Sequence, residues 1–198
     1  AERPWIAGSF QWSGIEHRGE TVWPRLCSAS GAVDLFLNKK DAFYQNQSLW
    51  TEKPMLHILP HWNMPEREGE TVRVVVYTNC ESAELFQDGC SVGKQQVKPI
   101  GHAEWNIIYR PGRLTAVGIK NGVEVSETIE TSGQASELRM EIVSELPASG
   151  KRGAVLIKCS CADSEGRFVP DAEPETEFFC DNTPIARVAG TGSDNCDH

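Results

Sequence analysis

The sequence predicts a mainly β protein in which immunoglobulin-like antiparallel β-sandwich domains follow a single βα unit. Apolar and polar residues alternate in several short segments between residues 71 and 161, as strands with one buried face require. The dipeptides Asp88-Gly89 and Asn121-Gly122 are strong signals for two-residue hairpin turns. Helical spacing is evident in one segment, which begins near residue 41. These patterns divide the chain into three sections, residues 1–53, 54–132 and 133–198.

The first section combines a strand, a glycine-containing loop and a helix. Ile6–Trp12 has the composition of a buried parallel strand. Asn38 or Asp41 can cap the N-terminus of a helix. Three residues at helical spacing follow the cap: Phe43, Gln47 and Trp50. A strand, a loop and a helix in this order form one βα unit, the repeat from which a TIM barrel is built.

The second section has the pattern of an antiparallel sandwich. Alternation in Ala103–Tyr109 directs Trp105 toward the core. Pro111-Gly112 marks a further turn. Six segments are expected to be strands: Thr71–Tyr77, Ala83–Phe86, Ser91–Val97, Ala103–Tyr109, Leu114–Ile119 and Val123–Ile129. Short strands at regular spacing with turn signals between them indicate an immunoglobulin-like sandwich.

The third section contains fewer strand candidates. Ser164-Glu165-Gly166 is the expected turn. The candidate strands are Glu137–Val143, Ala154–Cys161, Glu175–Cys180 and Ile185–Ala189. Because an immunoglobulin-like sandwich has about seven strands, this section is expected to be a second sandwich that is small or truncated.

Charge and hydropathy exclude some classes of function. The chain has 19 basic and 28 acidic residues, for a net charge of −9, and no cluster of lysine and arginine. This balance argues against nucleic-acid binding and favours a neutral partner such as a sugar. No apolar run approaches the ~20 residues of a membrane helix, so no membrane partner is expected.

The cysteines give no disulfide framework. Their number, seven, is odd, so they cannot all pair within one chain. Cys159 and Cys161 would lie on one face of a strand, at the limit of disulfide geometry. Reduced, mostly buried thiols are favoured over a structural zinc site, and neither a metal nor a cofactor is expected.

Five segments resemble glycoside hydrolase family 2, the β-galactosidase family. The first two are WIAGSFQWSGIEHRGE at residues 5–20 and SASGAVDLFLNKKDAFYQNQSLW at residues 28–50, which are similar to the end of the catalytic barrel. The others are similar to the family's later β domains: AELFQDGCSVG at residues 83–93, GRLTAVGIKNG at 112–122 and RVAGTGSDNCDH at 187–198. The resemblance implies the C-terminal region of such an enzyme, with residues 1–53 as the last βα unit of the barrel.

The resemblance also implies where the chemistry lies. Retaining glycosidases use two carboxyl groups about 5–5.5 Å apart. In the family, an Asn-Glu pair and a second glutamate provide them from earlier barrel strands, and this chain contains no Asn-Glu dipeptide. No catalytic residue is therefore assigned, and the chain is expected to be an inactive accessory scaffold. Its implied partners are the missing catalytic barrel and a β-linked saccharide, and a homo-oligomer is allowed.

Trp12 is the one residue to which the resemblance gives a role. The matching tryptophan ends the last barrel strand of the family and lines the sugar subsite. A sugar ring offers an apolar C–H face to a flat indole ring. We therefore expect Trp12 to bind substrate in the longer protein, and to pack under a loop when the barrel is absent.

Other candidate residues are weaker. Glu16, His17 and Glu20 place carboxylates beside a histidine, but the family has Asp-Tyr in place of Glu16-His17, so catalysis by this group is not favoured. His57 and His61 would lie about 13 Å apart on a strand, which disfavours a shared metal. These histidines match a family segment of the form H-x-x-P-H-W-x-W, from which Asn63 departs.

A second interpretation is a stand-alone carbohydrate-binding or adhesion module of tandem β-sandwiches, because a sandwich fold settles no function. Trp62 or Trp105 would then stack on sugars, although alternation points Trp105 into the core. A catalytic barrel encoded upstream would favour the enzyme, and a start codon at residue 1 would favour the module. The sugar, the export and the oligomeric state of the longer protein stay open.

Overall fold

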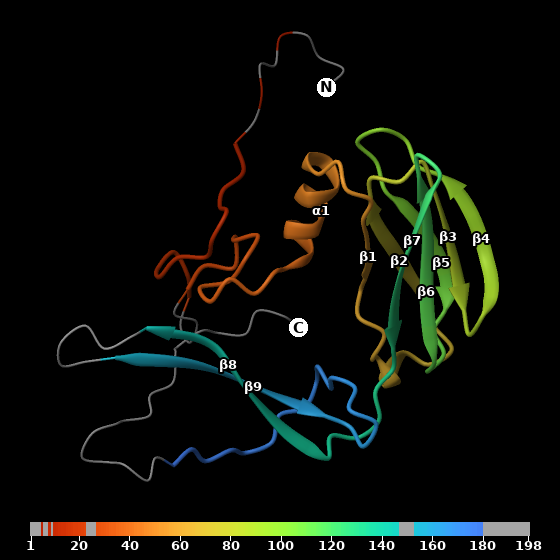
Figure 1. Cartoon of the computed structure of the whole chain (residues 1–198). Coiled ribbons are helices and arrows are strands. Elements are labelled where there is room, and N and C mark those ends of the chain that lie inside the picture. The colour runs from red at the N-terminus through yellow and green to blue at the C-terminus, as the bar shows by residue number, and fades with distance from the viewer. Residues whose placement is uncertain (1–4, 6–7, 9, 23–26, 147–152, 180–198) are drawn as a thin grey trace.

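The computed structural model of the protein describes residues 5, 8, 10–22, 27–146 and 153–179. One helix precedes a group of seven strands, and a two-stranded hairpin follows them (Figure 1). The strands form three antiparallel sheets, so the expectation of a mainly β fold is confirmed. Among the described residues, no helix has the length and apolar character needed to cross a membrane.

The seven strands form a sandwich of two sheets. The smaller sheet has the order β1 (Leu56–Leu59), β2 (Thr71–Thr78), β5 (Ala103–Ile108). The larger sheet has the order β4 (Cys90–Gln96), β3 (Ser82–Gln87), β6 (Arg113–Lys120), β7 (Val123–Glu130). A short 3₁₀ helix, Pro65–Arg67, connects β1 to β2. The six strands expected from alternation are confirmed, and β1 supplies the seventh.

Two turns fix the register of the larger sheet. Asp88 and Gly89 have φ angles of 49° and 80°, and Asn121 and Gly122 have 50° and 77°. Positive φ at both central residues is the requirement of a type I′ turn, which Asn, Asp and Gly meet at least cost. These turns join β3 to β4 and β6 to β7, as their dipeptides predict.

The core lies between the two sheets. Trp105 is 7% exposed, as alternation predicts, and its indole N–H donates to the carbonyl of Gly93 at 3.2 Å. Trp62 and Tyr109 meet edge to face with ring centroids 4.7 Å apart. The Trp62 N–H donates to the carbonyl of Arg110, and the Tyr109 hydroxyl accepts from the backbone N–H of Met64. Each buried ring therefore satisfies its polar atom, which lets large aromatics fill the core without an unpaired group.

The first section differs from expectation in two ways. The helix α1 spans Asp41–Trp50, but its N-cap is Lys40, and no side chain caps it. Asn38 donates instead to the carboxylate of Asp34 at 2.7 Å, so it is not available to α1. No strand is present at residues 10–12, the described end of the expected strand Ile6–Trp12. A parallel strand needs neighbours for its backbone groups, and no named strand of the described chain lies beside these residues.

The third section is a hairpin of β8 (Glu137–Leu146) and β9 (Ala154–Ala162), followed by the expected turn at residues 164–165. Residues 175–179 form no strand, so the expectation for Glu175–Cys180 is wrong within the described residues. Its aromatic pair, Phe178 and Phe179, is exposed and has no core to enter. Ile185–Ala189 and the motif at residues 187–198 lie outside the described residues. The division at residues 53 and 132 stays a prediction.

Asn63 joins the second section to the third. Its side-chain amide donates to Asp171 at 2.6 Å, and its carbonyl oxygen accepts from the backbone N–H and the hydroxyl of Ser132. Asn63 is buried, so these bonds satisfy groups that would otherwise be costly to desolvate. The position at which the sequence departs from the family pattern thus serves as a polar junction.

The described cysteines are all free thiols. Cys27, Cys80 and Cys161 are buried, and Cys90 and Cys159 are exposed. Reduced, mostly buried thiols were expected, and three of these five are buried. Cys180 and Cys196 lie outside the described residues.

Candidate functional site

Trp12 lies on the surface of the first section. Its side chain is 71% exposed, and its ring meets the imidazole of His17 edge to face at a centroid distance of 5.6 Å. Residues 13–22 and 27–40 fold back on each other beside it. Backbone bonds from Ser13 to Ser30 and from Glu16 to Val33 hold this fold-back together. Trp12 is therefore an exposed indole at the edge of these residues, and the expectation that it packs under a loop without the barrel is wrong for this structure.

The buried side chain of Glu16 holds that loop in place. It is 2% exposed, and its carboxylate accepts from the Lys40 ammonium at 2.6 Å. Lys40 also donates to the carbonyl of Ala29 at 2.9 Å. The backbone of Gly31 passes so close that a Cβ there would overlap the backbone N of Glu16. A carboxylate bound in this way holds the loop to the start of α1 and is not free to transfer a proton to a ligand.

His17 is the more accessible member of the group. Its Nδ1 lies 3.1 Å from the hydroxyl of Ser28, and its Nε2 lies 3.1 Å from the carboxylate of Glu20. The structure thus brings Trp12, His17 and Glu20 to one surface and separates Glu16 from them by burial. Polar groups beside an exposed indole suit the hydroxyls and the C–H face of a sugar ring.

The structure separates the two histidines of the second section. His57 lies in β1 between the carboxylates of Asp41 and Glu127, whereas His61 is exposed beyond the end of the strand. Among the residues that the structure describes, no group of three potential metal ligands gathers at one point. The partners of His57 are far away in the sequence, so no local pattern pointed to them.

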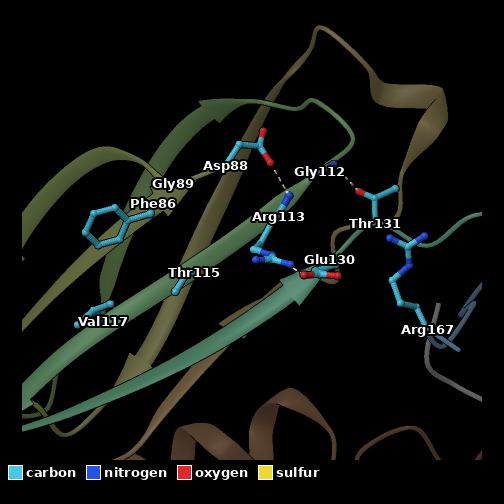
Figure 2. Close-up of a pocket in the computed structure, with 10 residues that line it drawn as sticks. All are labelled: Phe86, Asp88, Gly89, Gly112, Arg113, Thr115, Val117, Glu130, Thr131 and Arg167. Atoms are coloured by element: carbon cyan, nitrogen blue, oxygen red, sulfur yellow. Dashed lines mark hydrogen bonds and ion pairs between the residues drawn. The ribbon is translucent and has the colours of Figure 1, made fainter. Parts of the chain in front are cut away.

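A hollow lies on the outer face of the four-stranded sheet, near the ends of β3, β6 and β7 (Figure 2). It measures about 750 Å³. Its lining residues are Phe86, Asp88, Gly89, Gly112, Arg113, Thr115, Val117, Glu130, Thr131 and Arg167. Sequence reasoning did not find this hollow, because its residues come from four separate segments. The local signals were the turns Asp88-Gly89 and Pro111-Gly112, where Gly112 has a φ of 153°.

The charged groups of this hollow are engaged with one another. Arg113 donates its backbone N–H to Asp88 at 2.8 Å and its guanidinium to Glu130 (Figure 2). Arg167 binds the buried Asp163 at 2.7 Å. Bonds from Gly133 and from Arg167 hold the pKa of the Asp163 carboxyl far below its ordinary value, although burial opposes this. Asp88 and Glu130 are therefore structural partners of Arg113 and not a nucleophile and acid poised across a substrate.

Comparison with known proteins shows which sequences this chain is similar to. A sequence profile described as a domain of unknown function (DUF4982) matches residues 69–126, which run from the start of β2 into β7. A putative β-glucuronidase of Formosa agariphila is 36% identical over 89% of this chain and 18% of its own length. β-Galactosidase BoGH2A of Bacteroides ovatus is 30% identical over 98% of this chain and 23% of its own length.

Solved structures are similar to this chain in both sequence and fold. A β-glycosidase from Bacteroides vulgatus has 34% identity and a TM-score of 0.75, over 84% of this chain and 22% of that one. A glycosyl hydrolase family 2 member from Bacteroides cellulosilyticus has 28% identity and a TM-score of 0.66, over 71% of this chain and 22% of that one. The chain is homologous to part of a family 2 glycoside hydrolase. It spans about a fifth of the length of the curated relatives that it matches.

Family 2 homology confirms the resemblance carried by the sequence motifs and leaves the role of Trp12 a prediction. In the family 2 enzymes named above, the matched segment is a minor share of each chain. The names of the relatives include both β-glucuronidase and β-galactosidase, so the narrower assignment to β-galactosidases is supported only in part.

Proposed function

We propose that this chain is the part of a retaining family 2 β-glycosidase that ends the catalytic barrel and forms the sandwich behind it. The observation that carries the proposal is the match of nearly the whole chain to about a fifth of enzymes named β-galactosidase and β-glucuronidase. In this proposal, the catalytic carboxyl pair belongs to other residues of the longer protein. The substrate class is a terminal β-glycoside, either a galactoside or a glucuronide.

In this proposal the described residues contribute to activity in two ways. The first is substrate contact: Trp12 provides an indole surface, and His17 stands at its edge. The second is support: the Glu16–Lys40 pair fixes the loop that carries Trp12 to the start of α1. Catalytic geometry must hold to within a fraction of an ångström, so a rigid support behind a substrate-binding ring affects the rate.

Three carboxylates near the loop and the hollow have basic partners. Within the described residues, Glu16 pairs with Lys40, Glu130 with Arg113 and Asp163 with Arg167. A nucleophilic carboxylate and an acid must both face the scissile bond. Glu16, Glu130 and Asp163 do not form such a pair. We therefore propose that the chain alone is a scaffold.

The test is made in the full-length protein that contains this chain. We expect that protein to hydrolyse an aryl β-galactoside or an aryl β-glucuronide with retention of anomeric configuration. Trp12→Ala is expected to lower kcat/KM by about tenfold, since it removes one stacking contact worth roughly 1.4 kcal/mol. The matched control is Trp50→Ala, an equally exposed tryptophan at the end of α1. Inverted product, or a Trp12 variant with unchanged kcat/KM, would count against the proposal.

A further inference from the structure

His57 lies where the helix meets the sandwich. It belongs to β1, next to α1 (Figure 1), and its side chain is 16% exposed. Its Nε2 lies 2.9 Å from a carboxylate oxygen of Asp41, the first residue of α1. Its Nδ1 lies 3.5 Å from a carboxylate oxygen of Glu127 in β7. The ring of Tyr44, also from α1, stacks on the imidazole at 3.7 Å with an interplanar angle of 13°.

Both ring nitrogens therefore face carboxylates. A neutral imidazole has one N–H, so it can donate to only one of the two, and the other nitrogen would present a lone pair to a negative charge. The imidazolium has two N–H groups and can serve both partners. The buried Nδ1 has no fully formed hydrogen bond, since its contact with Glu127 is long. The arrangement favours the protonated ring.

Glu127 is held in place independently of His57. Its other carboxylate oxygen accepts from the backbone N–H of Ile58 at 2.7 Å. Since β1 pairs only with β2, this bond links the free edge of β1 to β7 in the opposite sheet. The carboxylate cannot turn away from His57 without breaking that link, so loss of the His57 proton is not relieved by a simple rotation.

The electrostatic surroundings agree with the geometry. Burial lowers the pKa of His57, but the hydrogen bond to Asp41, the longer contact with Glu127 and the negative charges of both carboxylates outweigh it, so the pKa lies above its ordinary value of 6.5. The other titratable groups that face this point are Tyr44 and Tyr77, and burial raises the pKa of both above 10.0. The Lys39 ammonium lies 5.9 Å from the centre of the Tyr44 ring. Histidine is the residue type at this junction whose ordinary pKa is nearest to neutral.

We propose that His57 is a pH-sensitive latch that holds α1 against the sandwich. The protonated ring joins Asp41 of α1 to Glu127 of β7, and loss of the proton leaves two carboxylates facing one N–H. The latch goes beyond the proposed glycosidase function and does not depend on it. Its consequence in a longer protein is that the junction between helix and sandwich loosens as the pH rises.

The direction of the effect follows from linkage. A group whose pKa is raised on folding stabilises the folded form fully below its unfolded value, here 6.5, and loses that contribution as the pH rises through the folded value. Between these two values, the equilibrium constant for docking of α1 falls by up to about tenfold per pH unit.

The experiment measures hydrogen exchange of the α1 amides in the 198-residue chain at pH 5.5, 7.0 and 8.5. Rates are expressed as protection factors, which removes the intrinsic pH dependence of exchange. We expect α1 protection, relative to that of the β2 and β6 amides, to fall by at least about fivefold from pH 5.5 to 8.5. The imidazole signal of His57 in an NMR titration is expected to report a midpoint above 6.5.

Variants separate the latch from a general loss of stability. His57→Gln and Asp41→Asn are each expected to abolish the pH dependence of α1 protection, at a lower level of protection. The control is His102→Gln, since His102 also contacts a carboxylate, that of Glu104 at 3.4 Å, whereas the carboxylates at His57 are those of Asp41 and Glu127. It is expected to leave the α1 profile unchanged. Flat α1 protection in the unmodified chain, or an equal pH slope in His57→Gln, would overturn the proposal.

Discussion

Glu16 and His57 are of residue types that serve acid–base catalysis, and their contacts give both a structural role. Lys40 neutralises Glu16 in the interior of the first section, and two carboxylates and a stacked tyrosine enclose His57. Sequence analysis considered Glu16 as part of a catalytic group and His57 as a metal ligand, and it favoured neither role. It could not supply the partners, because Lys40 follows Glu16 by 24 residues and Glu127 follows His57 by 70. Side-chain contacts at such separations follow from the fold and not from local pattern.

The Glu16–Lys40 pair gives a prediction at this scale. Glu16→Ala leaves the Lys40 ammonium without its partner in a largely buried position, which should destabilise the loop by about 2–3 kcal/mol. The measurement is the free energy of local opening from hydrogen exchange at the amides of Glu16, Ser28 and Ala32, which close the fold-back. Glu20→Ala is the control. Its exposed pair with His17 should contribute less than about 0.5 kcal/mol. Equal losses in the two variants would mean that the buried pair does not hold the loop.

The strands of the sandwich were the most predictable elements. Period-two alternation and two type I′ turn dipeptides set their positions, because one face of each strand must be buried and each turn needs positive φ. The predicted strands that are not found in the described residues, the end of Ile6–Trp12 at residues 10–12 and residues 175–179 of Glu175–Cys180, were inferred mainly from apolar composition. A strand also needs a hydrogen-bonding neighbour, which composition does not report. The cap of α1 failed for a related reason, since Asp34 binds Asn38 instead.

Strand β3 gives a prediction at the element scale. Leu85 is 0% exposed at the centre of the core cluster. Leu85→Ala should lower the free energy of unfolding of the sandwich by about 3 kcal/mol, because it removes buried methyl groups and leaves a cavity. The measurement is the urea midpoint, followed by tryptophan fluorescence at unchanged m-value. Ile108→Ala in β5, where the side chain is 43% exposed, should cost less than about 1 kcal/mol. A small loss for Leu85→Ala would mean that β3 is not central to the core.

At the scale of the whole molecule, the chain joins a surface loop, a sandwich and a hairpin. Sequence motifs gave the family correctly, since they reflect both turn chemistry and inherited pattern. They did not place the hollow bounded by Arg113 and Arg167 or the junction at Asn63, because those depend on how distant segments meet. Because the chain matches about a fifth of the length of its relatives, we propose that it is a supporting part of a longer protein. In that account the sandwich stabilises the barrel and Trp12 extends toward the substrate.

The central claim is that this chain contributes structure and one sugar-contacting residue to a glycosidase but not its catalytic carboxyl pair. The most direct test is steady-state hydrolysis of an aryl β-galactoside and an aryl β-glucuronide by the pure 198-residue chain, beside the full-length protein that contains it. The account predicts release of the aryl group by the full-length protein and a rate no higher than buffer for the chain alone. Sustained turnover of either substrate by the chain alone would contradict it.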